Sequence, residues 1–96
     1  MTKKRSEQKS YRELERMVRG FANHRRIQIM EILQKKPEMS VDEIATFLDI
    51  NYKTVADHVR RLAIAGLVLK RNQDVSVRHR LTDRAESILK FLRTTA

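Results

Sequence analysis

The fold is decided by residues 40–66, which read SVDEIATFLDINYKTVADHVRRLAIAG. Ser40 and Glu43 form a capping box, in which two side chains satisfy free backbone N–H groups at the start of a helix. Apolar residues then recur at helical spacing as far as residue 48, and residues 49–51 are only long enough for a tight turn. Because Asn51 can cap a second helix, the stretch predicts two short helices, the first over about 41–48, joined in a helix-turn-helix.

The second helix of this unit, expected over residues 51–65, separates an apolar face from a polar one. Side chains near its start can exchange hydrogen bonds with base edges in a DNA groove, and two later arginines fall where phosphates would pass. The candidate base contacts are Asn51, Tyr52, Lys53, Thr54 and Asp57, and the candidate phosphate contacts on this helix are Arg60 and Arg61. The alternative is an amphipathic helix whose outer face is charged only because it is exposed to solvent.

Two of these residues have a second interpretation. The ring of Tyr52 could pack on the preceding helix instead of reaching DNA. The carboxylate of Asp57 would repel phosphate, so it either accepts from a cytosine amino group or forms an ion pair with Lys53 or Arg61, four residues away; the ion pair is favoured. Lys53 lies outermost and is the strongest candidate for base readout.

After Gly66 the spacing of apolar residues changes from the helical period to a period of two. This change predicts a hairpin over residues 67–81, with its turn at Asn72-Gln73-Asp74 and with His79 on the inward face. The outward face of the hairpin should carry candidate phosphate contacts, which are Arg78 and Arg80, joined at the base by Lys70 and Arg71.

Three further helices flank these elements, over about 11–19, from 22 or 24 to 35, and over 83–94. Ser10 and Glu13 form another capping box, Gly20 is expected to break the first helix before Asn23, Pro37 ends the second, and Thr82 can cap the last. Residues 1–9 read as a disordered basic tail. The order of five helices and a two-stranded hairpin predicts a mainly α winged helix-turn-helix domain over residues 10–96, with the hairpin as its wing.

Composition excludes several classes of protein. The 96 residues suffice for one small domain, and the absence of cysteine excludes disulfides and thiol nucleophiles. No phosphate-binding glycine loop, nucleophile motif or catalytic carboxylate pair appears, so an enzyme is not expected. No apolar run approaches the roughly 18 residues of a membrane span. The expected location is the cytoplasm, on the nucleoid when DNA is bound.

The distribution of charge points to an anionic partner. Lys and Arg number 21 against 12 Asp and Glu, a net charge of +9. Residues 51–81 carry 7 positive and 2 negative side chains, whereas residues 21–50 carry 4 and 5. A charge that served only solubility has no reason to concentrate on the helix-turn-helix and the hairpin, so double-stranded DNA is the expected partner.

The outermost helices predict a homodimer. Each has an apolar stripe that lies outside the helix-turn-helix core and would otherwise face water. The alternative is that both helices pack only on the core of their own chain. The candidate interface residues are Leu14, Met17, Val18 and Phe21 of the first helix and Ile88, Leu89, Phe91 and Leu92 of the last.

Five short motifs resemble the ArsR-type winged-helix repressors over about residues 22–82. They are Ala22-Asn23-His24-Arg25-Arg26-Ile27, Ser40-Val41-Asp42-Glu43-Ile44-Ala45, Lys53-Thr54-Val55-Ala56-Asp57-His58-Val59, Ala65-Gly66-Leu67-Val68 and His79-Arg80-Leu81-Thr82. The resemblance implies a homodimeric transcription regulator, expected to be a repressor, that binds a palindromic operator and is usually released by a signal. The effector is not indicated.

The sequence departs from the metal-sensing members of that family, which place Cys pairs in the third helix or Asp and His ligands in the last. The three histidines, His24, His58 and His79, form no ligand-spaced pair, so no metal or cofactor is expected. Two other functions stay open at this point: an unspecific nucleoid-type DNA-binding protein, and a winged-helix module that binds protein.

Overall fold

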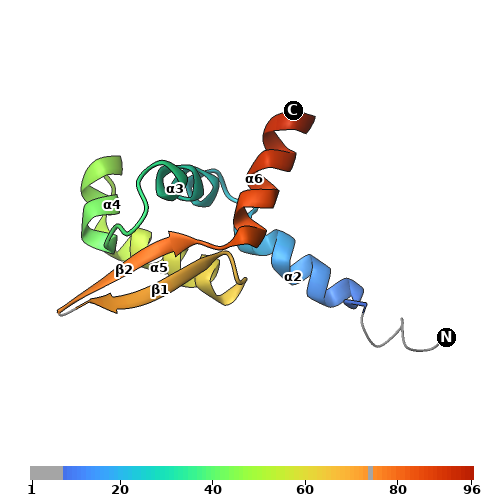
Figure 1. Ribbon diagram of the computed structural model, residues 1–96, viewed down its shortest axis with the longest axis horizontal. Helices are drawn as coiled ribbons and strands as arrows, with labels where there is room; N and C mark the ends of the chain where they lie inside the picture. The colour runs from blue at the N-terminus through green and yellow to red at the C-terminus, as the bar shows by residue number, and fades with distance from the viewer. Residues whose placement is uncertain (1–7, 74) are drawn as a thin grey trace.

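The computed structural model describes residues 8–73 and 75–96, which form five helices and one antiparallel hairpin (Figure 1). The elements are α2 (Tyr11–Phe21), α3 (His24–Lys35), α4 (Val41–Leu48), α5 (Tyr52–Ile64), β1 (Val68–Gln73), β2 (Ser76–Leu81) and α6 (Asp83–Thr95). The predicted mainly α architecture is confirmed, and residues 1–7 of the predicted tail lie outside the described residues. None of the described helices combines the length and apolar content needed to cross a membrane.

The helices begin at the predicted caps. In α2 and α4 the capping boxes are complete: Glu13 and Glu43 accept from the backbone N–H of Ser10 and Ser40 at 2.8 and 2.9 Å. Thr82 accepts from the backbone of the first turn of α6. These local bonds explain why the starts of these helices are readable from the sequence.

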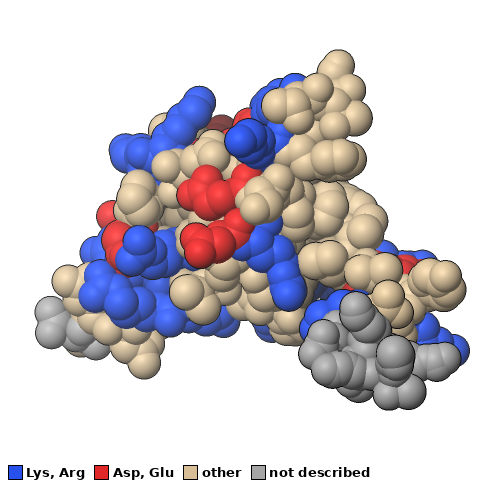
Figure 2. Space-filling model, turned by 45° about the vertical axis from the view of Figure 1, so that its right-hand side comes forward, with Lys and Arg blue, Asp and Glu red and all other residues tan. Residues whose placement is uncertain are grey.

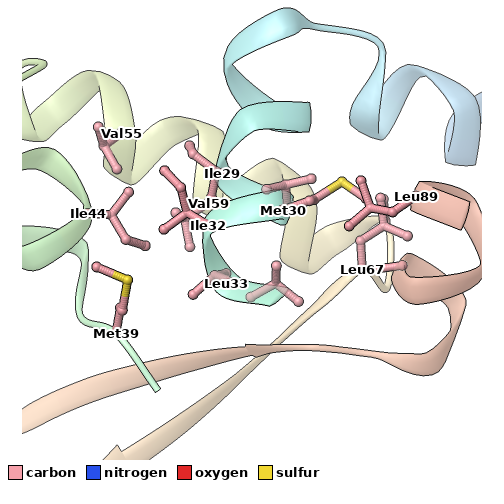
Figure 3. Close-up of a cluster of buried hydrophobic side chains, with 14 of the residues drawn as sticks. Ile29, Met30, Ile32, Leu33, Met39, Ile44, Val55, Val59, Leu67 and Leu89 are labelled. Atoms are coloured by element: carbon pink, nitrogen blue, oxygen red, sulfur yellow. The ribbon is translucent and has the colours of Figure 1, made fainter. Parts of the chain in front are cut away.

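The core is built around α3, whose buried side chains lie at the centre of the cluster drawn in Figure 3. Its Ile29 and Met30 are fully buried. Figure 3 shows Ile44 of α4 on one side of this helix and Leu67 and Leu89 on the other. Leu89 is only 2% exposed, so it belongs to the core of its own chain and is not available to a second protomer; its assignment to a dimer interface was wrong.

Gly20 lies inside α2 and does not break it, contrary to prediction, because the helix continues to Phe21. The glycine serves close packing instead: a Cβ at Gly20 would lie 2.3 Å from the Cβ of Ala65, just after α5. A residue larger than glycine at position 20 would collide with Ala65.

The turn of the hairpin is displaced from its predicted position. β1 continues through Asn72 and Gln73, and Gln73 pairs with Ser76, so these two predicted turn residues belong to the strand; Asp74 is outside the described residues. Ladder pairing overrides the turn preference of Asn72.

The hairpin is tied to the core by the segment before α4. Glu38 N–H donates to the His79 carbonyl at 2.8 Å, and His79 N–H donates to the Met39 carbonyl at 3.0 Å. The His79 ring is 2% exposed and its Nδ1 bonds to the same Met39 carbonyl at 2.8 Å, which confirms the inward orientation of this residue. Figure 1 shows the hairpin tip at one end of the molecule and α2 and α6 at the other.

Candidate nucleic-acid interface

The start of α5 is fixed by Asn51. Its Oδ1 accepts from the backbone N–H groups of Lys53 and Thr54 at 2.8 and 3.3 Å, as expected of a cap. The cap therefore uses the amide oxygen of Asn51 and leaves its NH₂ group as a donor for a base edge.

The three residues that follow the cap face solvent. Tyr52 is 54% exposed, so its ring does not pack fully against α4. Lys53 and Thr54 are also exposed, while Val55, one residue further, is fully buried. The first turn of α5 thus presents polar groups outward from a firmly anchored helix.

Asp57 forms the ion pair favoured from the sequence. Its two carboxylate oxygens accept from Arg60 at 2.7 Å and from Arg61 at 3.1 Å, and these hydrogen bonds lower the pKa of Asp57. Arg61 is one of the two predicted partners; the other, Lys53, is replaced by Arg60. The carboxylate holds both arginines near the end of α5.

The hairpin has one basic face. The register pairs Arg71 directly with Arg78, and Leu69 with Arg80, so the three arginines share a face. Lys70 pairs with His79 and lies on the other face, contrary to the expectation that it joins the arginines. Lys70 and Arg71 are adjacent in one strand, so only one of them can share the face of Arg78 and Arg80, and the register between the strands decides that it is Arg71.

Two acidic residues from outside the hairpin neutralise part of this face. Glu38 accepts from Arg71 Nη2 at 2.9 Å and lies 3.7 Å from Arg80, and Glu43 accepts from Arg78 at 2.7 Å. The Ser40 N–H and the Arg78 guanidinium both lower the pKa of Glu43. Because like charges directly opposite each other on a hairpin repel, these carboxylates explain how Arg71 and Arg78 can be neighbours.

Glu38 occupies an unusual backbone position. Its φ is +68°, a left-handed conformation that residues other than glycine rarely adopt. Hydrogen bonds hold it there, since its N–H donates to His79 and its carbonyl accepts from Arg78 at 3.2 Å. The segment before α4 and the hairpin therefore act as one unit.

Two of the three histidines, His58 and His79, make structural contacts. His58 Nδ1 accepts from Arg26 Nε at 3.1 Å, and burial, then the charge of Arg26, lowers the pKa of His58. Burial also lowers the pKa of His79. Within residues 8–73 and 75–96, no three His, Cys, Asp or Glu side chains are grouped so that they could hold a metal ion.

Sequence reasoning missed the partners of these residues. Glu43 was recognised only as a capping residue, yet the same Oε1 that accepts from Ser40 also accepts from Arg78. Arg78 and Glu43 are 35 positions apart, and Arg26 and His58 are 32 apart, so no local pattern could have joined them.

On the face shown in Figure 2, Lys and Arg gather at the hairpin end, and Asp and Glu lie both near the middle of the face and beside these basic residues at its left edge. A family model described as winged helix-turn-helix DNA-binding matches residues 23–68, from the cap of α3 to the first residue of β1. The chain has the winged helix-turn-helix fold. In this domain α5 is the helix that follows the turn, and the hairpin is the wing.

Solved structures of regulators share the fold of this winged helix-turn-helix domain. The homodimeric DNA-binding domain of a possible ArsR-family transcriptional regulator from Mycobacterium bovis is 24% identical, with a TM-score of 0.79 over 92% of this chain and 87% of that one. HlyU from Vibrio cholerae is 25% identical, with a TM-score of 0.74 over 86% and 90%. The transcriptional repressor PagR of Bacillus anthracis is 22% identical, with a TM-score of 0.74 over 86% and 99%.

These likenesses show that the chain shares the winged helix-turn-helix fold of these proteins. No curated protein sequence gives a significant match to it.

Proposed function

We propose that this domain is a homodimeric transcription regulator of the ArsR type that represses transcription by binding a palindromic operator in double-stranded DNA. In this proposal α5 enters the major groove, and the wing lies along the neighbouring backbone. The protein then acts in the cytoplasm, on the nucleoid.

The observation that carries the proposal is the polar, exposed start of α5 beside a wing with three arginines on one face. Asn51, Tyr52, Lys53 and Thr54 are the proposed base contacts; Asp57, whose carboxylate already accepts from two arginines, would reach a base only if those bonds opened. The proposed phosphate contacts are Arg60, Arg61, Arg71, Arg78 and Arg80, with Lys70 on the opposite face of the wing.

The apolar surface of the outer helices supports a dimer. Leu14 and Val18 of α2 are 41% and 49% exposed, and Phe91 of α6 is 62% exposed, all at the end of the molecule away from the wing. Burying one such side chain contributes about 1.5–3 kcal/mol, so a second protomer on this surface would be favourable. The remaining proposed interface residues are Met17, Phe21, Ile88 and Leu92.

The regulatory part of the proposal is supported by the neighbours. The Mycobacterium bovis domain is homodimeric, and PagR is a repressor. A dimer places two copies of α5 about one helical turn of DNA apart, roughly 34 Å, which is the reason to expect a palindromic site.

The test measures affinity for the DNA upstream of the protein's own gene and for scrambled DNA of equal length, at several salt concentrations. We expect the upstream DNA to bind at least about 1,000-fold more tightly at physiological salt, as specific regulators do. Equal affinity for both DNAs at every salt concentration would show an unspecific DNA-binding protein. No binding at low salt would show a protein-interaction module.

A further inference from the structure

A groove lined by arginines lies between α2 and α5. Its volume is about 210 Å³, and the five arginines on its walls are Arg16, Arg19, Arg26, Arg60 and Arg61. Among the described residues, no Asp or Glu lines it. Two carboxylates pair with these arginines: Glu15 accepts from Arg19 at 3.1 Å, and Asp57 accepts from Arg60 and Arg61. Five guanidinium groups against two carboxylates leave the groove positive.

Arg26 is fixed at the base of this groove. Its Nη1 donates to the carbonyls of Arg19 and Gly20 at 3.1 and 3.3 Å, near the end of α2, and its Nε donates to His58. Burial and the positive charge of Arg61 both lower the pKa of Arg26. Positive charges are therefore crowded here, and an anion between them would relieve the repulsion.

The arginines of α2 lie away from its apolar stripe. Arg12, Arg16 and Arg19 recur at the spacing i, i+4, i+7, and Leu14, Val18 and Phe21 recur at the same spacing two residues later. The two sets fall roughly opposite each other on a helix of 3.6 residues per turn. The apolar stripe can thus bury itself in a dimer while the arginines stay open to another partner.

The groove continues the surface that α5 would present to DNA. Arg60 lies seven residues after Lys53, about 10 Å along the helix, and on nearly the same side. The major groove is about 12 Å wide, so when the first turn of α5 touches base edges, its last turn lies near the bordering backbone. That is where phosphates would meet the arginines of both helices.

We propose that the arginine groove between α2 and α5 binds backbone phosphates of double-stranded DNA, so that the dimerisation helix α2 is also a DNA-binding element through Arg16 and Arg19. The inference rests on the proposed function, because α5 must occupy the major groove for the phosphates to reach α2. With α2 at the dimer end of the molecule, the phosphates concerned lie toward the centre of the operator.

The test compares two double variants that each remove two positive charges. Arg16→Gln with Arg19→Gln changes the groove; Lys90→Gln with Arg93→Gln changes exposed positions of α6 outside it. We expect the slope of log affinity against log salt to fall by about 0.9 for each phosphate that the first variant no longer binds, and to stay unchanged in the second. Preference for the upstream DNA over scrambled DNA should persist, since base contacts are untouched.

A second variant separates a phosphate contact from a structural role. Arg16→Lys with Arg19→Lys keeps both charges and should retain most of the salt slope. Ethylation of single phosphates on the operator provides a readout with the unaltered protein. Ethyl groups on phosphates toward the operator centre should weaken binding of the unaltered protein. They should not further weaken binding of the variant with Arg16→Gln and Arg19→Gln. If upstream DNA is preferred but the variant with Arg16→Gln and Arg19→Gln keeps the full salt slope, the arginine groove is not a phosphate site. If the unaltered protein does not prefer upstream DNA, the proposed function itself is contradicted.

Discussion

Arg78 of the wing donates a 2.7 Å hydrogen bond to Glu43 Oε1 in the first turn of α4. The same oxygen accepts from the backbone N–H of Ser40 at 2.9 Å, so one carboxylate both starts a helix and holds the wing. An arginine proposed to bind phosphate is therefore already paired, and DNA must replace the carboxylate.

Substituting Glu43→Gln should increase DNA affinity. The Gln side chain keeps an oxygen for the Ser40 N–H but loses the negative charge that competes with phosphate for Arg78. An exposed ion pair is weak, so we expect a rise of at most about fivefold, together with a steeper salt dependence. The control is Asp42→Asn, which removes one charge from the same exposed turn. Equal increases in both variants would attribute the effect to net charge alone.

Substituting Lys53→Ala should relax sequence choice at one base pair in each half-site. A good base contact provides about 1–3 kcal/mol of discrimination, so the preference at that base pair should fall by roughly 5- to 150-fold. Affinity is measured on the operator and on its single-base variants, with Lys90→Ala as a control on α6. Uniform weakening on every sequence would make Lys53 a phosphate contact.

Substituting Phe91→Asp should produce monomers. The side chain is 62% exposed in the protomer, and a carboxylate there would have to be buried without a partner in the proposed dimer. Sedimentation without DNA checks this result. Phe47→Asp is the matched control, because Phe47 is 60% exposed but lies on α4. A parent chain that remains monomeric at every concentration would remove the proposed interface.

The free energy of unfolding should depend on pH through His79. Burial lowers its pKa in the folded chain, so between that value and about 6.5, the ordinary value for the unfolded chain, the unfolded state binds more protons. Stability is therefore complete above pH 6.5 and falls as the pH drops below it. Urea unfolding from pH 5 to 7.5 should show a smaller change for His79→Gln than for the parent.

The control for this substitution is Lys90→Gln at an exposed position of α6, which removes no histidine and should keep the full pH change. Some change should persist in His79→Gln, because burial lowers the pKa of His58 as well. An identical profile for parent and His79→Gln would contradict the prediction.

Features governed by neighbouring residues were predictable from the sequence. Ser40 and Glu43 form their capping box within one turn, and Asn51 caps α5 through N–H groups two and three positions away. The alternation that placed His79 inward also depends on adjacent residues. Each is an interaction that a short window of sequence contains in full.

Features that depend on tertiary packing were not predictable. Gly20 read as a helix breaker because only the folded chain places Ala65 against it. Leu89 belongs to a stripe that looks exposed until α6 is laid on the core. The hydrogen bond between Glu38 and Arg71 joins residues 33 positions apart, and Glu38 has a left-handed backbone conformation. Neither the pairing nor the conformation is visible in a local sequence pattern.

The contact between Gly20 and Ala65 fixes the position of α2 relative to α5. Because only the Ala65 methyl group lies between the backbone of α2 at Gly20 and the end of α5, the two helices cannot slide independently. In the proposed dimer, this contact then sets the distance between the two copies of α5. That distance in turn sets the number of base pairs between the half-sites. Gly20→Ala, by forcing α2 outward, should change the spacer length that binds most tightly, as measured on operators whose half-sites are moved apart one base pair at a time.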